Sequence, residues 1–286
     1  MKNPVNQKQH KLPQVYMREF GYKFNTQWKV SVMKVGEKFV RQKSIEGFLS
    51  ETNIFKIKNS YESLENIFEG LNGMIENEYL NLINDLESQK KFSEKSCFLL
   101  LQIIPNLLCR TDSIRDLVKE ILNSDSKINF IKMICIDNYA KIEDLESQNY
   151  FNVMINQTLS EGLINKTLIF LSRHLQLRLM NYEIVILKSQ DEKTWFTTDN
   201  PIIFENRIGK FDILNVDSEI YFPLNPKFLI YLHNKKSVDK LNKFRSLETN
   251  KIYEVNNDEN VELQQKIVSN AIEYVIFDGE FKYKIE

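Results

Sequence analysis

The spacing of apolar residues changes twice along this 286-residue chain, and that change restricts the folds open to it. Between about residues 60 and 90 the apolar side chains recur every three or four positions, which is the period of an amphipathic helix. Further helices are predicted over residues 93–108, 113–122, 127–136 and 148–181, the last with a break near Gly162. Pro105 is expected to kink or end the helix that contains it.

Shorter β-type runs lie on both sides of this helical region. Residues 28–32 alternate apolar and polar before a turn at Gly36, which is typical of a β-hairpin. Later runs at 182–187, 194–197, 202–204, 220–222 and 228–232 are joined too closely for crossover helices, so they predict an antiparallel sheet. A helix at 261–272 and a closing strand at 274–277 follow. We therefore predict an α+β fold in a single domain, with an N-terminal motif and hairpin at 10–58, a mostly helical region at 60–181 and a β-rich region with a C-terminal helix at 182–286.

Glycine and cysteine are scarce, and their positions exclude several classes of protein. The eight glycines form neither a G-x-G-x-x-G nor a G-x-x-x-x-G-K-[ST] loop, so no nucleotide cofactor is expected. Cys97, Cys109 and Cys135 lack the C-x-x-C pairing of a structural zinc site, and their apolar neighbours predict small buried thiols in a reducing compartment. No apolar run approaches a membrane span, and no signal-type segment opens the chain. We expect a cytoplasmic protein without a membrane partner.

The overall charge balance does not indicate a class of binding partner, but the charges are unevenly distributed along the chain. The chain has 38 Lys and Arg against 39 Asp and Glu, which removes the broad basic footprint of a protein that holds nucleic acid by bulk charge. Acidic residues crowd between Glu62 and Glu87, whereas basic residues gather on or near the first motif described below. A polyanion, if one binds, is therefore expected to bind beside His10.

The first polar motif runs from His10 to Phe20. In an extended segment, alternate residues share a face, and Pro13 biases the residue before it toward an extended conformation. This face would carry His10, Gln14, Tyr16 and Arg18. An imidazole there can act as a general base, and a guanidinium can pair with an anion. The alternative is that apolar residues of this N-terminal segment pack it against the fold, with His10 serving only as a local cap.

The second polar motif is the segment from Trp195 to Pro201. A buried-looking strand ends there in two hydroxyls, a carboxylate at Asp199 and a carboxamide at Asn200. A carboxylate held at a strand end makes a good metal ligand or general base. Asp-Asn-Pro is equally a common way to build a turn, because both side chains can bond to the local backbone.

The third polar motif is a stripe along the first long helix. Glu65, Glu69, Asn72 and Glu76 share one face, and Gln102 follows on the next helix. Most stripes of this kind are solvated faces. No paired-histidine metal motif exists, so any metal would rest mainly on oxygen ligands, for which Asp199 and Glu65 are the candidates; this favours Mg or Mn over zinc.

The order of these motifs resembles the domain of unknown function 4238 family over nearly the whole chain. The matching residues are His10, Pro13, Gln14, Tyr16, Glu65, Gln102, Asp199, Asn200 and Pro201. The resemblance implies a shared site containing His10, Gln14, Tyr16 and Asp199, but it supplies no activity. Asn72 stands where the family usually has a second Glu, and Pro105 where it usually has an Arg. These departures weigh against a two-carboxylate or Arg-assisted mechanism.

Two functions from different classes are consistent with these residues. The first is an enzyme that processes nucleic acid or a nucleotide, such as a nuclease-like toxin or an antiviral defence effector. Its expected catalytic residues are His10, Tyr16 and Asp199, and its expected substrate-binding residues are Gln14, Arg18, Gln102 and Asn200. The alternative is a non-catalytic binding or assembly protein whose polar motifs are structural. Convergence of the three catalytic candidates on one open pocket would favour the enzyme, whereas separate positions or burial in the core would count against it.

Overall fold

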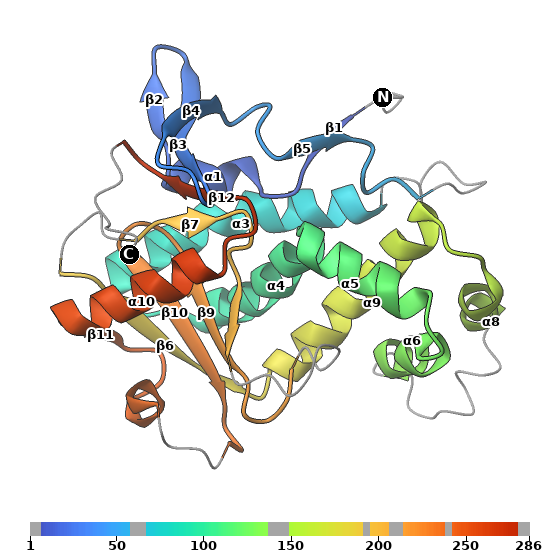
Figure 1. Cartoon of the computed structure of the whole chain (residues 1–286). Coiled ribbons are helices and arrows are strands. Elements are labelled where there is room, and N and C mark those ends of the chain that lie inside the picture. The colour runs from blue at the N-terminus through green and yellow to red at the C-terminus, as the bar shows by residue number, and fades with distance from the viewer. Residues whose placement is uncertain are drawn as a thin grey trace.

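The computed structural model describes residues 7–57, 67–136, 149–190, 195–205, 214–237 and 242–279. Its helices and sheets confirm the predicted α+β class (Figure 1). A helical region occupies the middle of the chain, and strands from the two ends of the chain meet in one sheet.

The helices of the middle region follow the apolar period of the sequence. They are α3 (Ile67–Gln89), α4 (Glu94–Arg110), α5 (Asp112–Leu122), α6 (Lys127–Ile136), α8 (Asn149–Asn156) and α9 (Glu161–Leu179). Ser93 caps α4 and Ser160 caps α9, each by accepting a hydrogen bond from a backbone N–H three residues later. The predicted break in the last of these segments lies at residues 157–160, just before Gly162.

Pro105 lies inside α4 and does not end it, so α4 runs on to Arg110. Of the two outcomes expected at Pro105, a kink or an end, the end does not occur, and the helix predicted over residues 93–108 is present. Proline removes one backbone donor, but Pro105 is buried in the core where α4 packs against α9. Tertiary packing on a largely buried helix offsets the missing hydrogen bond.

A central sheet has the strand order β11-β6-β10-β9-β8. Its strands are β6 (Tyr182–Lys188), β8 (Ile203–Glu205), β9 (Glu219–Pro223), β10 (Phe228–Asn234) and β11 (Ile252–Glu254). All pairs are antiparallel except β11–β6, which is parallel and departs from the predicted antiparallel sheet. The connection over residues 235–251, which contains the 3-10 helix η1 (Lys243–Ser246), is long enough to bring β11 back in the same direction as β6.

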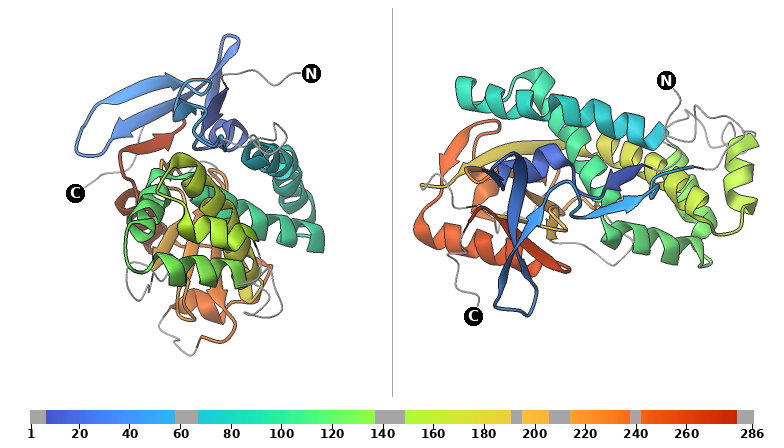
Figure 2. Two further views of the ribbon diagram at one scale, coloured as in Figure 1. Left: turned by 90° about the vertical axis from the view of Figure 1, so that its right-hand side faces the viewer. Right: turned by 90° about the horizontal axis from the view of Figure 1, so that it is seen from above.

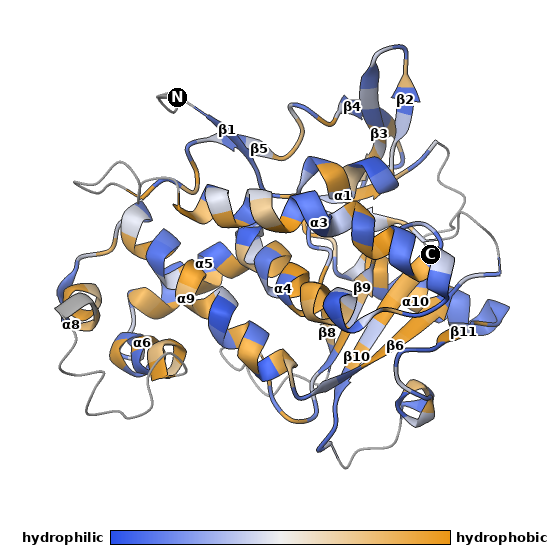
Figure 3. Ribbon diagram, turned by 180° about the vertical axis from the view of Figure 1, so that it is seen from behind, coloured by the Kyte–Doolittle hydropathy of each residue, from blue (hydrophilic) through white to orange (hydrophobic). Residues whose placement is uncertain are grey.

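Both faces of this sheet are covered, which explains its continuous apolar strands. Ile186, Ile220 and Ile230 belong to the main core with the helices, whereas Leu187 and Leu229 belong to a second core that includes residues of α10 (Asn257–Ser269). Burial on two faces removes the alternation expected of a half-exposed sheet. Figure 3 shows the resulting hydrophobic colouring along these strands.

A second sheet joins the two ends of the chain. Its strands are β2 (Tyr22–Phe24), β3 (Gln27–Lys34), β4 (Val40–Ser44), β7 (Thr197–Thr198) and β12 (Tyr274–Phe277), in the order β2-β3-β12-β7 with β4 paired to β3. The β3–β4 pair confirms the predicted hairpin. Together β2, β3 and β4 form a ribbon that projects from the body of the molecule (Figures 1 and 2). We call residues 22–44 the β-ribbon.

The N-terminal segment is only partly extended. β1 (Lys8–His10) pairs with β5 (Ser50–Thr52), but residues 14–19 form helix α1 (Gln14–Glu19), with Pro13 as its N-cap. The expectation that one extended face carries residues 10 to 18 was therefore wrong. Proline suits a helix start because its fixed φ is helical and no helical donor is lost there. Helix geometry places Gln14 and Arg18 on one face, with Tyr16 directed elsewhere.

The described residues contain no single helix that is both long and apolar enough to cross a membrane. α4 and α5 would meet that requirement only as a pair, and they are bent by 69° relative to each other. The predicted burial of the thiols is confirmed for Cys109 and Cys135, whereas Cys97 is half-buried. Burial raises the pKa of Cys135 to about 11.

Candidate functional site

His10 lies at the foot of the β-ribbon, beside the turn that follows β4. Its Nε2 atom is 3.2 Å from the carbonyl oxygen of Glu46 and 3.3 Å from Nε2 of Gln14. A carbonyl only accepts hydrogen bonds and an amide nitrogen only donates them, so each neutral tautomer of the imidazole satisfies one of these contacts. Burial lowers the pKa of His10, which keeps the ring neutral at pH 7. The neutral imidazole can therefore take up a proton.

Gln14 links His10 to an exposed cation. Arg18, one turn later on α1, donates from Nη2 to Oε1 of Gln14 at 3.3 Å. The imidazole, carboxamide and guanidinium thus form a row at the surface, as the first motif predicted, although a helix rather than a strand aligns them. This arrangement can hold an anion beside a proton-transferring group.

Arg110 holds the backbone of His10 in place. Its Nε and Nη2 atoms donate to the carbonyl oxygen of His10, at 3.0 Å for Nε, and Nη1 donates to Glu76 at 2.6 Å. The Arg110 side chain is 1% exposed, so its charge is desolvated and needs this pairing. Sequence reasoning missed Arg110, because a basic residue closing a helix is normally read as a favourable partner of the helix dipole.

In the described part of the polar stripe, Asn72 and Glu76 contact α4. Nδ2 of Asn106 donates to Oδ1 of the fully buried Asn72 at 2.7 Å, one helical turn before the pair of Glu76 and Arg110. Burial raises the pKa of Glu69. α3 and α4 therefore do supply a carboxylate and an arginine in contact. The residues are Glu76 and Arg110, rather than residues at the positions of Asn72 and Pro105.

Gln102 lies one turn before Asn106 on α4. Among the described residues, no contact joins it to His10. It lines a pocket between α3, α4 and α9 together with Asn72 and Asn106. Glu65, the other residue expected at this helix pair, lies outside the described residues.

Tyr16 is sealed in the core, away from any open surface. Its hydroxyl donates to the carbonyl oxygen of Pro223 at 2.9 Å and lies 2.6 Å from Oγ1 of Thr197. Its ring stacks on Phe222 with a centroid distance of 5.6 Å. Burial raises the pKa of Tyr16 far above its usual value, so the phenol stays neutral. These contacts tie α1 to β7 and β9, and we leave Tyr16 out of the site built around His10.

Asp199 and Asn200 join the second motif to the C-terminal segment. The two carboxylate oxygens of Asp199 accept hydrogen bonds from the backbone N–H groups of Ile272 and Glu273, at 3.0 and 2.7 Å. Nδ2 of Asn200 donates to the carbonyl oxygen of Asn270 at 3.3 Å. Both residues therefore fix the connection between α10 and β12. These bonds reach backbone about 70 residues away, so they differ from the local turn bonds that were the alternative for this motif. No described contact links them to His10.

No metal centre is formed by the described residues. They contain no group of three or more His, Cys, Asp or Glu side chains arranged to hold an ion. The two oxygens of Asp199 already bind backbone amides. The expectation of Mg or Mn stays a prediction.

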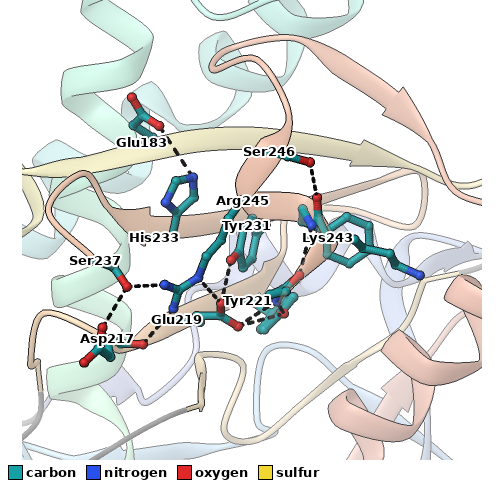
Figure 4. Close-up of polar contacts among 12 residues, drawn as sticks. Glu183, Asp217, Glu219, Tyr221, Tyr231, His233, Ser237, Lys243, Arg245 and Ser246 are labelled. Atoms are coloured by element: carbon teal, nitrogen blue, oxygen red, sulfur yellow. Dashed lines mark hydrogen bonds and ion pairs between the residues drawn. The ribbon is translucent and has the colours of Figure 1, made fainter. Parts of the chain in front are cut away.

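A buried ionic network that sequence reasoning missed joins β9 and β10 of the central sheet to the segment around η1 (Figure 4). Glu219 on β9 accepts hydrogen bonds from Tyr231 at 2.8 Å and from Nε of Arg245 at 2.5 Å. Asn242 donates to the same carboxylate at 2.6 Å, and Arg245 also bonds to the carbonyl oxygen of Asp217 at 3.0 Å. Every oxygen of Glu219 is thus partnered, which is what a buried carboxylate requires. The network fastens the connection after β10 to the sheet and presents no free reactive group.

Comparison with known proteins places the chain in a family. No curated protein and no solved structure matches it. Residues 8–280 match the family described as Protein of unknown function (DUF4238). That match begins at β1 and includes the described contacts of His10, Arg110 and Asp199. The chain therefore belongs to the DUF4238 family of proteins of unknown function.

Proposed function

We propose that this protein is an enzyme that processes nucleic acid, in which the β-ribbon holds the phosphate backbone and His10 transfers a proton at its foot. The observation that carries the proposal is the charge of the β-ribbon. It contains six basic residues against one acidic residue, Glu37, a net charge of +5 in a chain whose total is −1. The basic residues are Lys23, Lys29, Lys34, Lys38, Arg41 and Lys43.

Several of these charges are available to a ligand. Lys23, Lys38 and Lys43 are exposed and have no ion-pair partner among the described residues. Phe24 and Phe39 are also exposed, at 51% and 73%, and Nζ of Lys29 stands 4.4 Å over the ring of Phe24. Lysines supply the phosphate contacts, and exposed aromatic rings supply stacking surfaces for bases.

The path of the chain connects this ribbon to His10. Helix α1 leads into β2, and the turn after β4 supplies the Glu46 carbonyl that contacts the imidazole. A phosphodiester held along the ribbon would reach His10 and Arg18 together. The neutral imidazole would then take the proton of an attacking hydroxyl, from water or from the 2′ position of RNA, as that oxygen bonds to phosphorus. The imidazolium would return this proton to the sugar oxygen that leaves as its P–O bond breaks, and Arg18 would stabilise the charge that develops on the phosphate.

A cleavage assay with end-labelled RNA, single-stranded DNA and duplex DNA tests this proposal. We expect the wild type to cut at least one of these and His10→Gln to lose about 100-fold or more in rate, the usual contribution of a general base. The double variant Lys235→Glu/Lys236→Glu, at exposed positions after β10, is the control and should keep wild-type activity. If no substrate is cut, or His10→Gln cuts at the wild-type rate, the proposal fails. We further infer that cleavage makes the protein a toxin. Expression of the wild type should then slow growth of the host, whereas expression of His10→Gln should not.

The second candidate is a non-catalytic binding or assembly protein. It is favoured by the contacts of Tyr16, Asp199 and Arg110, which fasten the terminal segments to the rest of the fold. In that case His10 also helps to hold the N-terminal segment in place, and His10→Gln should lower the melting temperature by several degrees. Neither the wild type nor the variant should then cut nucleic acid.

A further inference from the structure

A pocket of about 450 Å³ opens between α3, α4 and α9, and the proton-transfer chemistry proposed for His10 makes no use of it. This volume falls in the range of roughly 300–1,000 Å³ that is usual for small-molecule sites. Phe68, Leu99 and Ile169 form part of its apolar wall. Four of its lining residues carry carboxamides: Asn72, Gln102, Asn106 and Gln176. So many amide groups around one apolar pocket indicate a ligand with hydrogen-bonding edges.

The floor of the pocket holds a polar group with unused hydrogen-bonding capacity. Asn72 is 0% exposed, and its oxygen accepts the hydrogen bond from Asn106. Its Nδ2 atom is buried and makes no hydrogen bond, although it lies close enough to Glu69 to oppose the rise of that carboxyl pKa. A buried donor without a partner costs about 1–3 kcal/mol. An acceptor on a bound molecule would remove that cost.

The mouth of the pocket carries an uncommitted positive charge. Arg173 on α9 lines the pocket, is exposed and has no ion-pair partner among the described residues. Glu78, an acidic residue on α3 that also lines the pocket, is already paired with Lys95 at 3.0 Å. The mouth therefore favours a ligand with an anionic end, and a guanidinium suits a phosphate in particular.

We propose that this pocket binds a nucleoside monophosphate, with the base toward Asn72 and Asn106 and the phosphate at Arg173. A carboxamide pairs with a base edge because both present a donor beside an acceptor. The apolar wall covers the faces of the ring, and the depth between a buried floor and an exposed arginine separates the base from the phosphate. The proposal goes beyond cleavage at His10 and stands whether or not the protein cuts nucleic acid.

Isothermal titration of the full chain with AMP, GMP, CMP and UMP tests the proposal, and the parent nucleosides and inorganic phosphate serve as separate probes. We expect at least one nucleotide to bind and its nucleoside to bind more weakly. Arg173→Glu should weaken nucleotide binding by at least about tenfold, which corresponds to 1.4 kcal/mol, and leave nucleoside binding unchanged. Gln102→Leu, a half-buried position, should weaken both ligands.

Arg178→Glu is the matched control, because Arg178 is exposed on the same helix and does not line the pocket. It should bind nucleotide like the wild type. Absence of binding by all four nucleotides overturns the proposal, as does binding that neither Arg173→Glu nor Gln102→Leu changes. Binding of phosphate alone with the nucleotide affinity overturns it too, since the base would then contribute nothing. None of these outcomes depends on the cleavage assay, so the two proposals fail independently.

Discussion

The guanidinium of Arg110 binds the backbone carbonyl of His10, across 100 residues of sequence. The end of α4 thereby fixes the end of β1, and the imidazole of His10 is positioned through its own backbone. Glu76 on α3 completes the contact by pairing with the same guanidinium at 2.6 Å. The N-terminal strand is thus held to two helices by one buried cation.

Replacing Arg110 should loosen the N-terminal segment and destabilise the fold. Arg110→Met keeps the volume but leaves Glu76 and the His10 carbonyl without their partner, so we expect a loss of about 3 kcal/mol in the free energy of unfolding. Urea denaturation measures that loss, and hydrogen exchange should quicken at the Lys11 amide, which bonds to Leu49 in the native state. Arg178→Met on an exposed face is the control. Unchanged exchange at Lys11 in Arg110→Met would contradict the anchoring role.

Tyr16→Phe should affect stability and leave the chemistry at His10 intact. The variant keeps the ring packing but removes a buried hydroxyl that bonds to Thr197 and Pro223, at a cost of about 1–3 kcal/mol. Thermal melting measures the loss, and the cleavage rate at a temperature well below the transition tests for catalysis. A large loss of rate in a fully folded Tyr16→Phe protein would return Tyr16 to the catalytic group.

Much of the fold was predictable because local patterns and tertiary structure agree. The helix predicted over residues 127–136 has those bounds in the structure, and the hairpin around Gly36 and the strand over 274–277 are also present. Prediction failed where the local pattern is too short to interpret. The short helix α1 was missed because its six residues are too few for a clear apolar period.

The site was harder to predict than the fold, because its contacts join positions far apart in sequence. Motif reading found His10, Gln14 and Arg18, which lie within one short segment. It could not find that Arg110 pairs with Glu76, since each residue alone is typical of a helix surface. The same motif reading grouped Asp199 with His10, whereas backbone amides of the C-terminal segment occupy that carboxylate. Only the tertiary fold shows that Arg110 and Glu76 are in contact and that Asp199 binds the C-terminal segment rather than His10.

Charge reversal on the β-ribbon should weaken nucleic-acid binding and reduce its dependence on salt. Lys38→Glu/Lys43→Glu removes two exposed cations, so the slope of log K against log salt concentration should become shallower by about 2, roughly one for each phosphate that is no longer neutralised. Fluorescence anisotropy over a salt series measures the slope. Lys235→Glu/Lys236→Glu makes the same charge change elsewhere and should keep the wild-type slope. Equal slopes for the two double variants would exclude the β-ribbon as the binding surface.

The pair of Glu219 and Arg245 should show strong energetic coupling. Removing either partner leaves a buried charge, so Glu219→Gln and Arg245→Met should each cost about 3–5 kcal/mol. The double variant should lose clearly less than the sum, because neither charge then remains. Unfolding free energies of the four proteins give the coupling energy directly. Additive losses would show that the two groups act separately despite their 2.5 Å contact.

Acid should destabilise the protein through the half-buried His10 and the buried His233. Burial lowers the pKa of both His10 and His233, so between that lowered pKa and 6.5 the unfolded chain binds more protons than the native one. Stability is therefore greatest above the unfolded pKa and is lost as the pH falls below it. Urea denaturation between about pH 8 and pH 5 measures this loss in the wild type and in His10→Gln.

The difference between the two proteins isolates His10. Burial raises the pKa of Glu69, which stabilises the fold as the pH falls, but this contribution is present in both proteins and cancels. We expect a smaller loss of stability on acidification in His10→Gln. The double variant His10→Gln/His233→Gln should lose still less stability on acidification. Burial lowers the pKa of His233 more than the Glu183 carboxylate, 3.6 Å from Nε2, raises it. Parallel pH profiles for all three proteins would mean that neither imidazole changes its proton affinity on folding.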